Sequence, residues 1–135
     1  MLNVALWILQ ALLAAVFALT GAVKLVIPKE KLRTRMHWAG SWPPWRIKLL
    51  GLAELAGAIG LVVPVATGVA PLLTPVAALC LGGVMIGAVG THRRLGERVM
   101  PAVVVGALCV LVGAGRLAAP ERSPTARELA PGVRR

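Results

Sequence analysis

Apolar residues in this chain form four long runs, separated by short segments that hold most of its charged residues. A transmembrane helix needs roughly 20 predominantly apolar residues to cross about 30 Å of hydrocarbon. The pattern therefore predicts an all-α fold, a four-transmembrane-helix bundle with short loops, forming one domain over residues 1–118. The predicted spans cover about residues 2–27, 46–63, 75–90 and 101–117.

The segments outside the spans have their own signals. Residues 28–48 mix basic residues with tryptophans and are predicted to be a loop at the membrane surface, where amphipathic rings settle. Within that loop, Pro43-Pro44 is expected to block a helix and to fix the approach to the second span. Residues 119–135 are rich in Pro, Arg, Glu and Ser without apolar periodicity, so this tail is predicted to be disordered.

The composition agrees with a membrane protein and excludes most soluble classes. Hydrophobic residues make up 58% of the chain, charged residues only 15%, and the mean hydropathy is +0.81. The net charge of +10 sits in short clusters between apolar runs, which is typical of membrane loops and argues against a nucleic-acid partner. The lipid bilayer is the expected partner. The positive-inside rule places the basic loops 28–48 and 91–98 in the cytoplasm and both termini outside.

Glu54 is the one acidic residue inside a predicted span. A charge at the centre of a membrane helix costs roughly 2.5–3.5 kcal/mol on insertion scales, so such residues usually face other helices or a wet cavity. The residues one helical turn away are Leu50, Gly51, Gly57 and Ala58, and the small ones among them allow close helix approach. Glu54 is therefore predicted to point into the bundle.

Three further polar residues are candidates to meet Glu54. Lys24 ends the first span on the loop side with Thr20 one turn before it, and His92 closes the third span on that side. Glu54 lies about 12 Å into the second span from the same side by helix rise. The candidate polar site is therefore Lys24, Glu54, His92 and Thr20. It could hold a ligand head group or exchange protons, or the Lys24–Glu54 pair could only specify helix packing; Lys24 could also snorkel to the membrane surface.

Small residues indicate where helices approach each other. Gly83 and Gly87 form a G-x-x-x-G pattern, which is a typical packing face in membrane helices. The candidate helix-packing residues are Gly21, Gly51, Gly57, Gly83 and Gly87.

The two cysteines lie in separate spans and lack C-x-x-C spacing. Cys80 and Cys109 are predicted to be buried, unreactive packing residues. The sequence indicates no metal site and no cofactor motif, and it assigns no catalytic residue.

Several motifs together are similar to those of the DoxX-like family of small four-helix bacterial integral membrane proteins, over residues 10–117. The matching motifs are Gly21-x-x-Lys24-Leu25, Gly51-x-x-Glu54-Leu55-x-Gly57-Ala58-Ile59-Gly60-Leu61-x-x-Pro64, Leu73-Thr74-Pro75-x-Ala77-Ala78, Met85-x-Gly87-Ala88-x-x-x-His92 and Gly115-Arg116.

This resemblance implies a DoxX-like protein in the bacterial cell membrane. Some members are linked to thiosulfate oxidation with quinone as acceptor or to membrane redox complexes. It implies a membrane subunit or a small quinone- or lipid-binding protein with a redox role, with quinone and partner subunits as possible associates. One alternative is a small proton-coupled exporter, although such exporters carry their essential Glu in span one, where this chain has Lys24. The other is a structural or assembly protein without a ligand.

Overall fold

The computed structural model describes residues 1–119, and this part of the chain is helical with short connections, which confirms the predicted all-α bundle. Four of its helices are long and apolar enough to cross a membrane. The predicted disordered tail lies, apart from Ala119, outside the described residues. The long helices are α1 (Leu2–Val26), α3 (Pro44–Thr67), α4 (Leu73–Arg94) and α5 (Met100–Ala118), and the short ones are α2 (Lys29–Arg35) and the 3-10 helix η1 (His37–Ser41).

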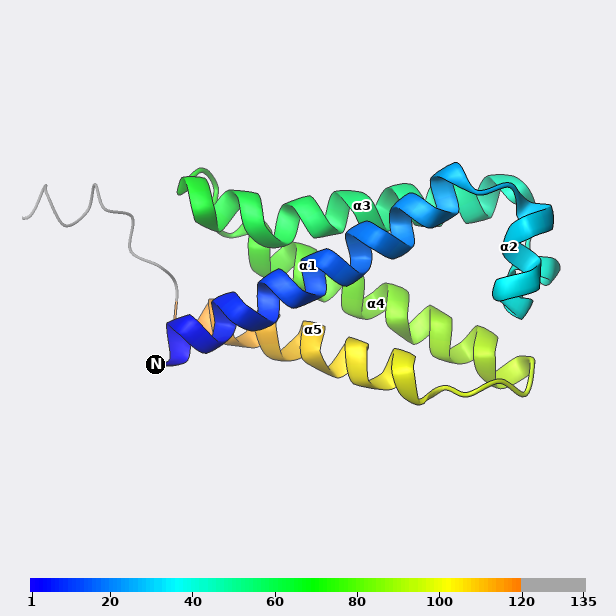
Figure 1. Ribbon diagram of the computed structural model, residues 1–135. Helices are drawn as coiled ribbons and strands as arrows, with labels where there is room; N and C mark the ends of the chain where they lie inside the picture. Colours follow the sequence, from blue (N-terminus) through cyan, green and yellow to red (C-terminus); the bar gives the residue numbers. More distant parts are fainter. Residues whose placement is uncertain (120–135) are drawn as a thin grey trace, which may run out of the picture.

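The long helices form two pairs (Figure 1). α1 packs along α3 and α4 along α5, while α1 and α5 make far fewer contacts with each other. The pairs lie closest near the α3–α4 turn and separate toward the opposite end, which we call the loop end because it holds residues 27–43 and 95–99. We call the end with Leu2 and Ala118 the terminal end.

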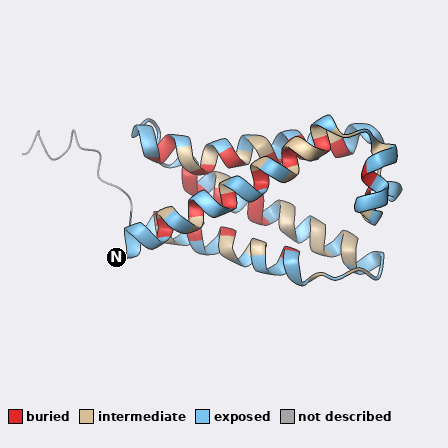
Figure 2. Cartoon of the chain, in the orientation of Figure 1, coloured by how far each residue is buried: buried red, intermediate tan, exposed pale blue. Residues whose placement is uncertain are grey.

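The core lies where the two pairs meet, and its buried positions gather in the middle of the bundle and toward the terminal end (Figure 2). Outward positions of the long helices carry large apolar side chains such as Ile8, Leu52 and Ile86, which is the reverse of a water-soluble surface and fits contact with lipid. The core residues are Leu13, Phe17, Ala58, Leu61, Ala78, Leu81, Cys109 and Val112.

The second span is longer than the apolar run predicts. α3 begins at Pro44, in the first turn where proline has no amide hydrogen to lose, and it continues through Pro64 before ending at Gly68 with φ of 70°. Membrane helices tolerate an internal proline because neighbouring groups satisfy the freed carbonyl. α4 likewise continues past residue 90, so His92 lies inside its last turn.

Residues 28–48 are not the simple loop that the sequence predicts. They contain α2 and η1, which fold against the loop end of the α1–α3 pair (Figure 1). Leu32, Ala39 and Ile47 form a second buried cluster there, and Trp38 and Trp42 pack against it with ring centroids 5.8 Å apart. Burial of these apolar side chains stabilises the segment. The turn-forming residues in the sequence give no indication of this apolar face.

The predicted packing glycines behave in two ways. A Cβ atom added at Gly21 would lie 2.7 Å from the Gly51 carbonyl oxygen, and one added at Gly57 would lie 2.6 Å from Leu81 Cδ2, so these glycines permit close helix contact. Within residues 1–119, no other helix packs against the predicted packing face of Gly83 and Gly87, because a Cβ atom added at either glycine would meet nothing within 4 Å.

The cysteines also differ from each other. Cys109 is fully buried in the core, as expected, but Cys80 is exposed on the outside of α4. The prediction that both are buried is therefore wrong for Cys80. Cys80 has apolar sequence neighbours because this side of α4 faces lipid, and not because it is buried.

Candidate functional site

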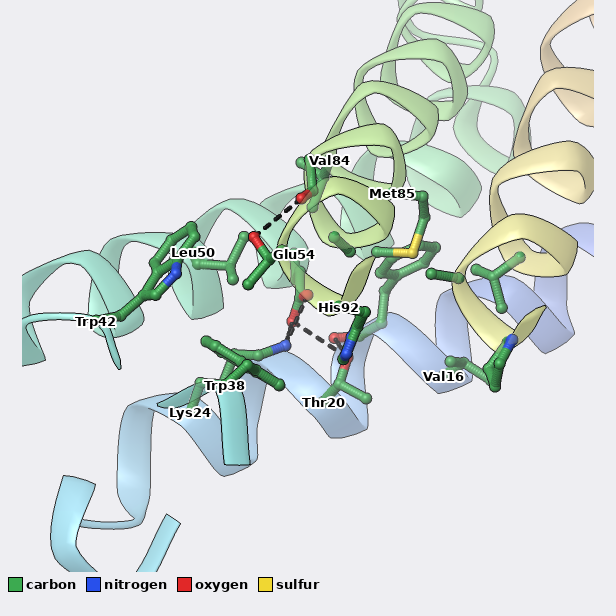
Figure 3. A pocket seen from close by; sticks show the side chains of 17 residues that line it. Val16, Thr20, Lys24, Trp38, Trp42, Leu50, Glu54, Val84, Met85 and His92 are labelled. Atoms are coloured by element: carbon green, nitrogen blue, oxygen red, sulfur yellow. Dashed lines mark hydrogen bonds and ion pairs between the residues drawn. The ribbon is translucent and has the colours of Figure 1, made fainter. Parts of the chain in front are cut away.

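A cavity of about 390 Å³ lies at the loop end, where the two helix pairs separate (Figure 3). Trp38 of η1 and Trp42, which directly follows η1, line it beside residues of all four long helices. Val16 of α1 and Pro101 of α5 line it and are exposed, so the cavity is open to the surroundings of the bundle. The other lining residues are Phe17, Thr20, Lys24, Leu50, Glu54, Val84, Met85, Gly87, Ala88, Thr91, His92, Ala102 and Val105.

Lys24 and Glu54 form an ion pair in the wall of this cavity. Lys24 Nζ lies 2.7 Å from Glu54 Oε1 and 2.5 Å from Oε2, and the two residues are only 5% and 2% exposed. Each charge lies one helical turn beyond a glycine of the α1–α3 crossing, Gly21 and Gly51. The close contact of these glycines brings the two helices near enough for the side chains to meet, so burial and pairing have the same origin.

Thr20 and Trp38 complete the surroundings of the pair. Thr20 Oγ1 donates a hydrogen bond of 3.1 Å to Glu54 Oε2, and Lys24 Nζ lies 5.7 Å from the centre of the Trp38 ring. The carboxylate thus accepts from an ammonium and a hydroxyl, while the ammonium also faces an aromatic ring. The result is a compact polar group, neutral overall, set into a largely apolar cavity.

His92 belongs to the same cavity but has a different partner. It lines the α4 wall, and its Nδ1 lies 2.5 Å from Glu97 Oε2, with both side chains about one quarter exposed. Of the four predicted site residues, the structure brings Lys24, Glu54 and Thr20 into direct contact. The His92 side chain instead pairs with Glu97, which the sequence did not single out.

Within residues 1–119, no group of three or more His, Cys, Asp or Glu is placed to hold a metal ion. Lys24, Glu54, Thr20 and His92 line the described cavity, and their side chains can supply hydrogen bonds, ion pairing and proton transfer.

A second polar cluster lies at the terminal end, around the buried side chains of Arg116 and Gln10. Arg116 of α5 donates hydrogen bonds of 2.8 Å from Nε to Gln10 Oε1 and from a terminal nitrogen to Asn3 Oδ1. Gln10 in turn donates to the carbonyl oxygen of Leu61, and Trp7 lies 5.2 Å from the guanidinium. The sequence does hold a signal for this cluster, because α1 begins and α5 ends on the same side of a four-span bundle, and Asn3 and Gln10 share one helix face.

The comparisons with known proteins agree with this architecture. Neither curated proteins nor solved structures gave a match. The family model described as the DoxX-like family matches residues 8–115, a range that includes every residue of the Lys24–Glu54–Thr20 contact and His92. The chain is a multi-pass helical membrane protein, and it belongs to the DoxX-like family.

Proposed function

We propose that this protein binds a membrane-soluble molecule with an apolar body and a polar head, a quinone or a lipid, in the loop-end cavity. The observation that carries this proposal is the polar group of Lys24, Glu54 and Thr20 in the wall of an otherwise largely apolar cavity. Ligand sites typically combine apolar walls with a few convergent polar groups in a volume of roughly 300–1,000 Å³. The cavity of about 390 Å³ falls in that range.

A quinone suits these groups chemically. Its carbonyl oxygens can accept hydrogen bonds from Lys24 Nζ and Thr20 Oγ1, and its ring and tail can pack on Phe17 and Met85. The tail can leave through the side where Val16 and Pro101 are exposed. A purely structural ion pair would need no cavity beside it, so the space favours ligand binding over a role in packing alone.

A redox role follows from quinone chemistry. Reduction of a quinone takes up electrons and protons, and His92 with Glu97 forms an acid–base pair on the same cavity, partly exposed at the loop end. We propose that Glu54 and His92 handle protons and that a partner subunit supplies or removes the electrons. This chain would then act as the membrane subunit of a redox complex.

Two glycines of α4 allow a matched test. Both Gly87 and Gly83 are exposed and have free space at the Cβ position, but only Gly87 lines the cavity. We expect Gly87→Leu to fill the cavity and to weaken binding of a short-tailed quinone at least tenfold, with Gly83→Leu unchanged. Quenching of tryptophan fluorescence in purified protein would measure this, because Trp38 and Trp42 line the cavity. Equal affinity in all three proteins, or no saturable binding in the wild type, would contradict the proposal.

We also propose that the protein lies in the bacterial cell membrane with loops 28–48 and 91–98 in the cytoplasm. Loop residues such as Arg33, Arg35, Arg93 and Arg94 give this side its positive charge. A reporter inserted near Gly40 should be active in the cytoplasm, and one fused after Arg135 should be active outside. Reporters on the same side would contradict the four-span topology, and reversed signals would contradict only the orientation.

A further inference from the structure

The outer face of α2 is strongly basic. Leu32 holds this helix to the bundle and is completely buried, whereas Lys31, Arg33 and Arg35 are exposed. α2 crosses the loop end of the α1–α3 pair (Figure 1). The inner side of the helix is therefore used for folding, while its cations point away from the bundle.

These cations have no acidic partner in the described part of the protein. The ion pairs found within residues 1–119 are Lys24–Glu54 and His92–Glu97, and neither involves α2. Glu30 is the one acidic residue between positions 28 and 48, against six basic ones. This concentrated positive charge calls for an external counterion.

The position of α2 points to the membrane surface as the source of that counterion. Trp45, in the first turn of α3, is 61% exposed, and the Arg46 guanidinium lies 5.2 Å from its ring. Exposed tryptophans of membrane proteins settle at the head-group level. Below this level the α3 surface is apolar, with Leu49 and Leu52 exposed.

We infer that α2 and the start of α3 form a binding surface for an anionic phospholipid. Arg33, Arg35 and Lys31 would bind the phosphate of its negatively charged head group, since guanidinium groups pair well with phosphate oxygens. The acyl chains would lie along Leu49 and Leu52 of α3. Neither nucleic acid nor an acidic soluble protein would use this combination of cations and an adjoining lipid-facing surface. This surface is separate from the cavity, so the inference does not depend on the proposed quinone or lipid ligand there.

The test compares two triple variants of equal charge. One variant is Lys31→Gln, Arg33→Gln, Arg35→Gln on α2, and the control is Arg122→Gln, Arg127→Gln, Arg134→Gln, outside the described residues. Native mass spectrometry would measure binding of phosphatidylglycerol and phosphatidylcholine to each purified protein. A basic residue near an anionic lipid surface contributes about 1 kcal/mol, roughly fivefold in affinity. We expect the α2 variant to lose its preference for phosphatidylglycerol by at least tenfold and the control to keep it.

The other outcomes would overturn the inference. A wild-type protein without preference for phosphatidylglycerol would show that the cations do not select anionic lipid. An equal loss in both variants would show that only net charge matters. Binding of quinone to the α2 variant should stay at the wild-type level, because none of its three residues lines the cavity. If the wild-type protein does not bind quinone, the proposed function is wrong. The lipid measurements still test the inference about α2 in that case.

Discussion

The two ends of the bundle both bury a charged side chain, but they surround it differently. At the terminal end, Arg116 is enclosed where α1 meets α5, and its hydrogen bonds to Gln10 and Asn3 join the two helices. At the loop end, Lys24 and Glu54 join α1 to α3, and a cavity lies beside them. Buried charge alone therefore does not indicate a binding site. A cavity beside the charged group is what distinguishes a candidate ligand contact from a purely structural one.

The largest effect should come from breaking the loop-end pair. Glu54→Leu leaves the Lys24 ammonium buried without a counterion, and we expect the free energy of unfolding to fall by about 3 kcal/mol. The double variant Lys24→Met, Glu54→Leu should recover most of that loss, since an apolar pair of similar volume is often no less stable. Denaturation in mixed micelles would measure this.

Quinone binding should be lost in both Glu54→Leu and the double variant. The double variant recovers stability, but it lacks the polar groups that would bind the quinone. Restored binding in the double variant would mean that the ion pair serves packing alone. That result would make the two ends of the bundle equivalent.

The next effect should come from the glycines near each cluster. A Cβ atom in Gly21→Ala would meet the backbone oxygen of Gly51 at 2.7 Å, whereas one in Gly115→Ala would meet the movable side chain of Leu6 at 2.7 Å. Overpacking against a rigid neighbour costs about 1–3 kcal/mol. We expect about 2 kcal/mol for Gly21→Ala and clearly less for Gly115→Ala, measured in the same micelles. Equal losses of stability in the two variants would show that the backbone contact between α1 and α3 can relax as easily as the Leu6 side chain.

A smaller change is expected from the terminal cluster. Arg116→Met removes donors from Gln10 and Asn3, and hydrogen bonds between membrane helices contribute about 0.6 kcal/mol on average and at most about 1.7. We expect a loss of about 1–2 kcal/mol in stability with quinone affinity unchanged. Reduced affinity at normal stability would assign the terminal end a part in ligand binding and would remove the distinction between the ends.

The smallest effect should distinguish the core from the lipid-facing surface. Cys109→Ala removes a buried sulfur from the core cluster and should cost about 0.5–1 kcal/mol. Cys80→Ala changes an exposed position and should leave both stability and binding at wild-type values. A large loss of binding in either variant would instead indicate a thiol in the mechanism.

The four spans could be predicted because each apolar run is long enough to cross the bilayer, and the length of an apolar run can be read directly from the sequence. The contact of Lys24 with Glu54 followed from depth, since both lie on the loop side. α2 and η1 were not predicted because each buries too few apolar residues, such as Leu32 and Ala39, to give a periodic pattern in the sequence. The exposure of Cys80 and Gly83 was missed because a lipid-facing side of a membrane helix is as apolar as its buried side.

The partners of the buried ion pair both belong to the first helical hairpin, residues 2–67. Ribosomes make this hairpin before α4 and α5, so Lys24 and Glu54 can neutralise each other while the second half of the chain is still being synthesised. Helices that insert first and associate afterwards are the usual order of assembly in membranes. The two charges can therefore pair as soon as α1 and α3 associate in the bilayer, and the later hairpin only has to close over a contact that already exists.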